Sequence, residues 1–182
     1  MVRHAESPFT PDQEEERGLS EKGWADARKV ADRLKHEQID VFISSHYARA
    51  VQTIEEAARQ QNKTIMTDAR LRERELASWD YRFDDFEQGI KHVFDNPDFA
   101  YPGGESNELA RKRGIAALVE VFQHHRGKKV AIGTHGNIMT LMMNHYDKQY
   151  HFAFWKQTTK PDIYKLSFED DTLVHVERLW EE

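Results

Sequence analysis

The side chains best suited to chemistry are histidines and arginines that each follow a short apolar run. Arg3 and His4 come directly after the first two residues, Arg49 follows one later apolar run and His135 follows another. The carboxyl ends of parallel strands meet at one edge of a sheet, so these distant side chains can share a pocket. Arginine forks and a helix start can bind phosphate, while one histidine attacks phosphorus and the other donates to a non-bridging oxygen. Spacing alone leaves open which histidine attacks.

A leaving alkoxide needs a proton, and the arginine-rich stretch 68–75 offers an acid. Glu73 is the candidate because neighbouring arginines can hold this stretch close to an anion. As an alternative, His4, His135 and Glu73 together could form a His-His-carboxylate zinc site. Two arginines beside a divalent cation are electrostatically unfavourable, so we expect no metal and no other cofactor.

The composition describes a soluble globular protein with an acidic balance. Of 182 residues, 38% are hydrophobic and 32% charged, and the formal net charge is −6. A nucleic-acid-binding surface normally shows as a basic stripe, and none is present. The absence of cysteine excludes disulfides and thiolate sites. The apolar runs are too short to cross a bilayer and no signal segment opens the chain, so we expect a cytoplasmic protein that binds neither nucleic acid nor membrane.

The hydrophobic pattern alternates between strands and helices. Ser20 is predicted to cap a helix whose apolar stripe includes Trp24, and a later helix carries Leu109 and Val119 at apolar positions. The predicted strands are 1–3, 39–43, 63–67, 129–133, 162–168 and 173–179, and the predicted helices are 21–35, 48–60, 83–95, 107–125 and 138–144. This order predicts one α/β domain over residues 1–182. We expect a three-layer sandwich with a mostly parallel central sheet and an antiparallel edge strand in the terminal hairpin.

Several other features are interpreted structurally. Residues 8–18 are predicted to form a loop, and the acidic run 12–16 within it is interpreted as a solvated face. The methionine-rich segment 139–143 is interpreted as core filling. The segment 79–101 is the variable stretch in which we expect substrate choice to be determined.

The ordered motifs resemble those of the histidine phosphatase superfamily, the phosphoglycerate-mutase-like proteins. The similar segments are Arg3-His4-Ala5-Glu6-Ser7, Leu19-Ser20-Glu21-Lys22-Gly23, residues 44–53, Leu71-Arg72-Glu73, Pro102 to Ser106, and Thr134-His135-Gly136. They occur in the order of the family and extend over almost the whole chain. The resemblance implies a phosphoglycerate-mutase-like fold and a small phosphorylated metabolite or other phosphoester as substrate.

The resemblance also implies a role for each site residue. His4 would be the transiently phosphorylated nucleophile, and Arg3, Arg49 and His135 would form the phosphate pocket. Glu73 would protonate the leaving group and then activate water. Further substrate contacts are assigned to Thr10, Arg74, Gly136 and Asn137.

Departures from the family pattern decide between activities. Thr10 replaces an asparagine usual in the family, and Ala77 and Tyr81 replace the two glycines often found around the tryptophan that is Trp79 here. The loop before Leu19 is shorter than in the glycolytic mutases and lacks their Thr-Gly-Trp stretch. The shorter loop without this stretch favours a phosphatase over a mutase, whereas the changes around Trp79 bear on substrate choice and Thr10 on one phosphate contact. The alternatives are a mutase-type phosphoryl transferase and a catalytically weak relative that binds phosphate without turnover.

Overall fold

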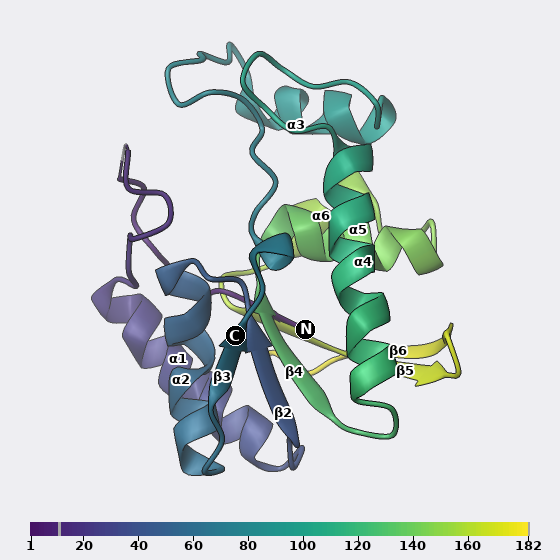
Figure 1. Ribbon diagram of the computed structural model, residues 1–182. Helices are drawn as coiled ribbons and strands as arrows, with labels where there is room; N and C mark the ends of the chain where they lie inside the picture. Colours follow the sequence, from purple (N-terminus) through teal and green to yellow (C-terminus); the bar gives the residue numbers. More distant parts are fainter. Residues whose placement is uncertain (11, 182) are drawn as a thin grey trace.

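The structure is a computed structural model that describes residues 1–10 and 12–181, which contain a six-stranded sheet with helices on both faces (Figure 1). The strands are β1 (Val2–Arg3), β2 (Val41–Ser44), β3 (Ile65–Thr67), β4 (Val130–Thr134), β5 (Asp162–Glu169) and β6 (Thr172–Arg178). The helices are α1 (Glu21–Lys35), α2 (Ala48–Gln60), α3 (Phe86–Asp95), α4 (Asn107–His124), α5 (Gly136–Tyr146), α6 (Phe152–Gln157) and the 3-10 turn η1 (Ala69–Leu71). Pro11 in the predicted loop and Glu182 at the end of the predicted domain lie outside the described residues.

The strand order is β3-β2-β4-β1-β5-β6. The pairs β1–β4, β2–β4 and β2–β3 are parallel, whereas β5 is antiparallel to both β1 and β6. The prediction of a mostly parallel sheet with an antiparallel hairpin at its edge is therefore confirmed. Gly133 of β4 lies level with Val2 of β1 and with Ser44 of β2. Because these strands run in the same direction, their carboxyl ends open at one edge of the sheet.

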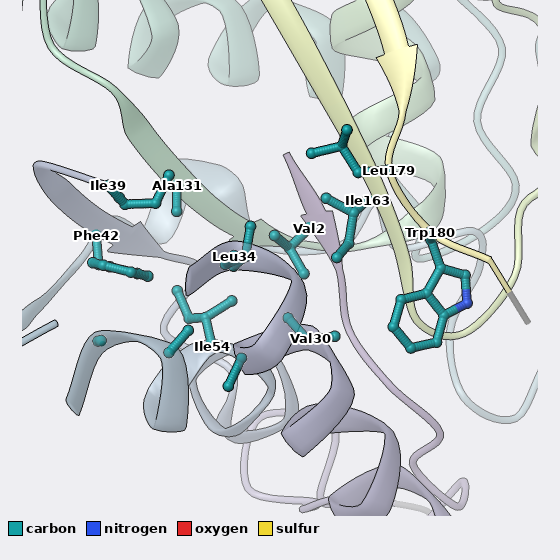
Figure 2. Packing of buried hydrophobic residues seen from close by; sticks show 13 residues of the cluster. Val2, Val30, Leu34, Ile39, Phe42, Ile54, Ala131, Ile163, Leu179 and Trp180 are labelled. Atoms are coloured by element: carbon teal, nitrogen blue, oxygen red, sulfur yellow. The ribbon is translucent and has the colours of Figure 1, made fainter. Parts of the chain in front are cut away.

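Alternating side chains of the central strands fill two separate cores, as a sheet covered on both faces requires. Phe42 and Ala131 pack with α1 and α2, and their neighbours Ile43 and Ile132 pack with α4 and α5. Figure 2 shows the first core, in which Val30, Leu34 and Ile54 approach the sheet. The three-layer prediction is confirmed, and the methionine-rich start of α5 is buried as expected.

The helix predictions hold in their positions but not in every apolar contact. The Ser20 hydroxyl accepts a hydrogen bond from the Gly23 amide at 3.0 Å, which confirms the predicted cap of α1. Trp24 is 39% exposed, Leu109 59% and Val119 44%, so their assignment to the apolar stripes was wrong. Each sits at helical spacing yet on the margin of the buried face, where periodicity does not distinguish contact from exposure.

Two short elements were not predicted from the sequence. The turn η1 has three residues and α6 has six, too few for helical periodicity to show. Both lie at the edge of the sheet where β1, β2 and β4 end. Leu71 of η1 is buried in the second core and thereby fixes the start of the segment that carries Glu73.

Candidate active site

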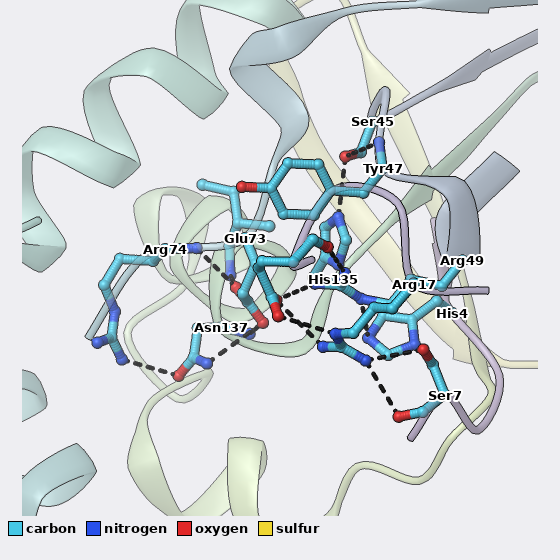
Figure 3. A network of polar contacts seen from close by, with 12 residues as sticks. His4, Ser7, Arg17, Ser45, Tyr47, Arg49, Glu73, Arg74, His135 and Asn137 are labelled. Carbon is cyan, nitrogen blue, oxygen red and sulfur yellow. Dashed lines mark hydrogen bonds and ion pairs between the residues drawn. The ribbon is translucent and has the colours of Figure 1, made fainter. Parts of the chain in front are cut away.

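Four predicted site residues meet where three parallel strands end. Arg3 ends β1 and His4 follows it, Arg49 lies in the first turn after β2, and His135 follows β4. The rings of His4 and His135 lie 5.1 Å apart between centroids, at an interplanar angle of 63°. Figure 3 shows both rings with Arg49 and Arg17 on one side of Glu73, and Arg74 with Asn137 on its other side.

The hydrogen bonds of His4 select one tautomer of its imidazole. Nδ1 lies 2.7 Å from the carbonyl oxygen of Ala5, which can only accept, so Nδ1 carries the proton. Nε2 accepts a hydrogen bond from Nε of Arg49 at 3.3 Å. The Nε2 lone pair therefore faces the guanidinium of Arg49, where an anionic phosphoryl group is attracted.

Burial and nearby charge keep this imidazole neutral. His4 is 5% exposed. Burial, followed by the positive charge of Arg49, lowers its pKa well below the ordinary value, and Arg3 and Lys160 act in the same direction. At neutral pH the lone pair therefore carries no proton, and it can attack phosphorus once the hydrogen bond from Arg49 is exchanged for one to a phosphoryl oxygen.

Arg49 is fully buried and forms hydrogen bonds to Glu14. The sequence had led us to interpret the acidic run that contains Glu14 as a solvated face. Its NH1 donates to the Glu14 carbonyl at 2.5 Å, and its NH2 donates to Oε1 of Glu14 at 2.6 Å. Arg17 donates to the same carboxylate, from Nε at 2.8 Å and from NH2 at 3.1 Å. The interpretation of the acidic run as a solvated face is therefore wrong for Glu14, which bridges two guanidinium groups beside His4.

The Glu14 carboxylate accepts hydrogen bonds from Arg17 and Arg49, as a bound phosphate would. Burial raises the pKa of Glu14, but hydrogen bonds and charge from Arg17 and Arg49 outweigh it and leave the pKa below the ordinary value. Glu14 is thus an anion held on donors that suit a dianionic phosphoryl group. A phosphate that binds both arginines must displace this carboxylate.

Replacing Glu14 with glutamine is expected to tighten inhibition by orthophosphate about threefold to tenfold, because a neutral amide competes less well for the arginines. Product inhibition at fixed substrate concentration measures the change. The exposed neighbour Glu16 provides the control, since Glu16→Gln leaves the bridge intact. Weaker inhibition in Glu14→Gln would show that Glu14 positions the arginines instead of competing with phosphate.

Arg3 is held against the start of α5. Its NH1 donates to the Thr158 carbonyl at 3.1 Å and also to the Thr158 hydroxyl. Within the described residues its buried Nε has no hydrogen-bond partner. A Cβ atom on Gly136 would lie 2.7 Å from Cζ of Arg3, so glycine is required here for the guanidinium to approach the helix.

Gly136→Ala is expected to raise the KM for phosphomonoesters about tenfold, because the added methyl group pushes the Arg3 guanidinium out of place. The value of kcat should fall less, since His4 is not contacted. Steady-state kinetics and the orthophosphate inhibition constant measure the effect, with the Tm as a check on folding. An unaltered inhibition constant would show that Arg3 does not bind phosphate.

His135 is held by a hydroxyl that was not predicted. Its Nε2 lies 2.9 Å from Oγ of Ser45, and Nδ1 is buried with no partner among the described residues. Burial, then the proximity of His4 and Arg49, lowers the pKa of His135 well below the ordinary value. The His135 ring lies beside that of His4, and within the described residues its Nδ1 is left to contact a phosphoryl oxygen.

Glu73 lies at the N-terminus of α5. Oε1 accepts from the amides of Arg74 at 2.9 Å and Ile138 at 3.0 Å, while Oε2 accepts from the amide of Asn137 at 3.1 Å and its Nδ2 at 3.3 Å. The helix dipole favours a negative group at this position. Glu73 is therefore fixed in space, and Asn137 is one of the groups that fix it.

The remaining predicted contacts differ in position. Arg74 is 2% exposed and donates to Oδ1 of Asn137 at 3.1 Å, while its Nε and NH1 have no partner within the described part of the chain. Burial lowers its pKa to about 10, against the opposing charge of Glu73. The Thr10 carbonyl accepts from the Gln13 amide at 3.3 Å, and in residues 1–10 and 12–181 no hydrogen bond joins its hydroxyl to the pocket. Substrate contacts by Arg74 and Thr10 stay predictions.

The ligand set of the zinc alternative is not assembled. Across residues 1–10 and 12–181, no three histidine, aspartate or glutamate side chains form a group that could hold a metal ion. His4 and His135 are neighbours, but the oxygens of Glu73 are directed at the amides of α5. The arrangement instead gathers guanidinium groups, which suit a phosphate oxyanion.

Comparison with known proteins places the chain in a family. The model of the histidine phosphatase superfamily (branch 1) matches residues 1–180, so the chain belongs to this superfamily of phosphatases and mutases. It is 27% identical over 145 residues to phosphoserine phosphatase 1 of Hydrogenobacter thermophilus, covering 74% of this chain and 69% of the relative. It is 29% identical over 146 residues to the probable phosphoglycerate mutase GpmB of Salmonella choleraesuis, covering 75% and 68%.

Solved structures show the same fold. Bacillus stearothermophilus YhfR has a TM-score of 0.74 at 24% identity, covering 97% of this chain and 93% of the other. A mycobacterial glucosyl-3-phosphoglycerate phosphatase with inorganic phosphate has a TM-score of 0.73 at 18% identity, covering 97% and 92%. The predicted phosphoglycerate-mutase-like fold is confirmed. No helix in the described part of the chain has the length and apolar character needed to span a membrane.

Proposed function

We propose that the protein hydrolyses small phosphomonoesters without a metal, through a phosphohistidine on His4. The observation that carries this proposal is the neutral His4, whose Nε2 lone pair faces Arg49 at 3.3 Å. A nucleophile beside a fixed cation is the requirement for attack on an anionic phosphoryl group. Membership of a superfamily of phosphatases and mutases supports the same reaction class.

In the first step, Nε2 of His4 forms a bond to phosphorus while the bond from phosphorus to the ester oxygen breaks. Arg3 and Arg49 stabilise the charge on the non-bridging oxygens, and His135 contacts one of them through Nδ1. Glu73 gives a proton to the departing alkoxide. Glu73 must be protonated before this step, although its present donors favour the carboxylate, and one of its hydrogen bonds is then exchanged for a bond that it donates to the leaving oxygen.

In the second step, water attacks the phosphohistidine and loses a proton to Glu73. The phosphorus–nitrogen bond breaks, the electron pair returns to Nε2, and orthophosphate leaves. Glu73 is then protonated again, ready for the next substrate. The cycle uses only side chains of this chain, with the positive charge supplied by arginines.

The test is a rapid-quench experiment with phosphorus-labelled p-nitrophenyl phosphate, stopped in base because phosphohistidine is acid-labile. We expect label on the peptide that contains His4, at a level approaching one group per chain, and turnover of at least one phosphomonoester in a panel of sugar phosphates, nucleotides and phosphopeptides. Turnover with no label on His4 would contradict the mechanism. Transfer of label to an added alcohol in preference to water would instead identify a mutase.

A further inference from the structure

Lys160 is a cation beside the site that the mechanism proposed above does not use. Arg17 and Arg49 share the carboxylate of Glu14, and Arg3 donates to Thr158. Across residues 1–10 and 12–181, Lys160 makes no hydrogen bond or ion pair. It was not singled out in the sequence, because a lysine between a polar run and a strand is ordinarily a surface charge.

The fold holds Lys160 at the edge where the site opens. Arg3 pairs with Asp162 across the antiparallel β1–β5 register, so the residues before Asp162 continue past the end of β1. The amide of Thr159 donates to Oδ2 of Asp162 at 3.1 Å, which closes the turn around Lys160. Asp162 is itself buried and paired with Arg178 at 2.9 Å. Lys160 is therefore carried by a turn that is fixed on both sides.

The charges around Lys160 belong to the site. Burial, then the charges of Arg3 and Arg17, lowers its pKa, and only Glu73 acts in the opposite direction. Lys160 in turn contributes to the lowered pKa of His4. The backbone two residues before Lys160 contacts the site directly, since NH1 of Arg3 donates to the Thr158 carbonyl at 3.1 Å. A further cation among arginines is repelled by them and becomes favourable when an anion binds.

The exposure of these side chains distinguishes two positions at which an anionic group could bind. Arg3 is 8% exposed, and Arg49 and His135 are fully buried, so the transferred phosphoryl group lies on the inner side against His4. Lys160 is an exposed residue although its ammonium is partly shielded by neighbouring groups, so it lies nearer to solvent than the inner set. A substrate with one phosphoryl group satisfies the inner set and leaves the ammonium without a counter-charge.

We propose that the preferred substrate carries a second anionic group, a carboxylate or a second phosphate, near the ester, and that Lys160 binds it. This inference rests on the proposed function and specifies the substrate class of the same site. Lys160 acts as a specificity-determining residue, because its partner is the part of the substrate that is not transferred. A point charge on a flexible stem suits an anion whose position varies between substrates.

Turnover is tested with a matched pair of esters, phosphoglycolate and ethyl phosphate, which differ by the carboxylate. The wild-type kcat/KM should be about tenfold or more higher for phosphoglycolate. Lys160→Met should remove most of that difference, and Lys160→Arg should restore part of it. The control is Lys156→Met, because Lys156 pairs with Glu87 instead of facing the site. An equal fall for both esters in Lys160→Met would assign Lys160 to the phosphoryl group and overturn the inference.

Binding is tested separately from turnover, by calorimetry with phosphonoacetate, methylenebisphosphonate and ethylphosphonate. Wild type should bind one or both of the first two about tenfold more tightly than ethylphosphonate, with the difference lost in Lys160→Met. Which of the two is preferred tells carboxylate from phosphate. Hydrolysis without any preference for a second anion would contradict the role of Lys160 and would still support the proposed phosphatase function. Tighter binding of a compound with a second anion, without hydrolysis of any ester, would contradict only the proposed phosphatase function.

Discussion

Replacing His4 with alanine is expected to lower kcat by about 10⁴-fold or more and to abolish labelling of the chain, because no other group supplies the lone pair that attacks phosphorus. Rapid-quench labelling and steady-state hydrolysis of p-nitrophenyl phosphate measure the two effects. His124→Ala, a change on the exposed end of α4, is the matched control for loss of an imidazole. Retention of label in His4→Ala would show that a residue other than His4 is the nucleophile.

The same experiment on His135→Ala separates the two histidines. We expect kcat to fall about 10²- to 10³-fold, the cost of removing one group that stabilises phosphoryl oxygens, while label still appears on His4. The tautomer of His4 gives the physical reason for this difference. Its Nδ1 is committed to Ala5 and its Nε2 faces Arg49, whereas one nitrogen of His135 is held by Ser45.

Sequence reasoning located groups whose position depends on the end of a strand. His4, Arg49 and His135 could be placed together because each follows an apolar run, and parallel strands end at a common edge. The Ser20 cap could be predicted for a similar reason, since its geometry is local. For these residues the chain direction alone determines where the side chain emerges.

Groups brought in by loops could not be located in this way. Glu14 and Arg17 reach the site because the loop after Ser7 folds back, where the Arg17 guanidinium donates to Oγ of Ser7 at 2.7 Å. The turn before β5, which carries Lys160, reaches the site through the Thr158 carbonyl, which accepts from Arg3 at 3.1 Å. In the sequence, Glu14 is one acid in an acidic run, and neither periodicity nor composition distinguishes it from its solvated neighbours.

Replacing Glu73 with glutamine is expected to slow phosphoryl transfer from alkyl phosphates by about 10²- to 10⁴-fold, because an alkoxide departs poorly without a proton. Transfer from p-nitrophenyl phosphate should slow much less, since nitrophenolate is a stable leaving group. The rate of the nitrophenolate burst, and the single-turnover rate with ethyl phosphate, measure the first step in each case. Steady-state rates are less informative, because hydrolysis of the phosphohistidine is the same for both substrates.

The contrast between leaving groups is needed because Glu73 also caps α5. Each of its oxygens accepts two hydrogen bonds, and the amide nitrogen of glutamine would face donors where one oxygen now accepts. That mismatch costs about 1–3 kcal/mol and lowers the Tm, whatever Glu73 does in catalysis. A purely structural role would slow transfer equally from both esters, since displacement of α5 moves His135 for either substrate. Only loss of the proton donor makes the defect grow with the basicity of the leaving oxygen.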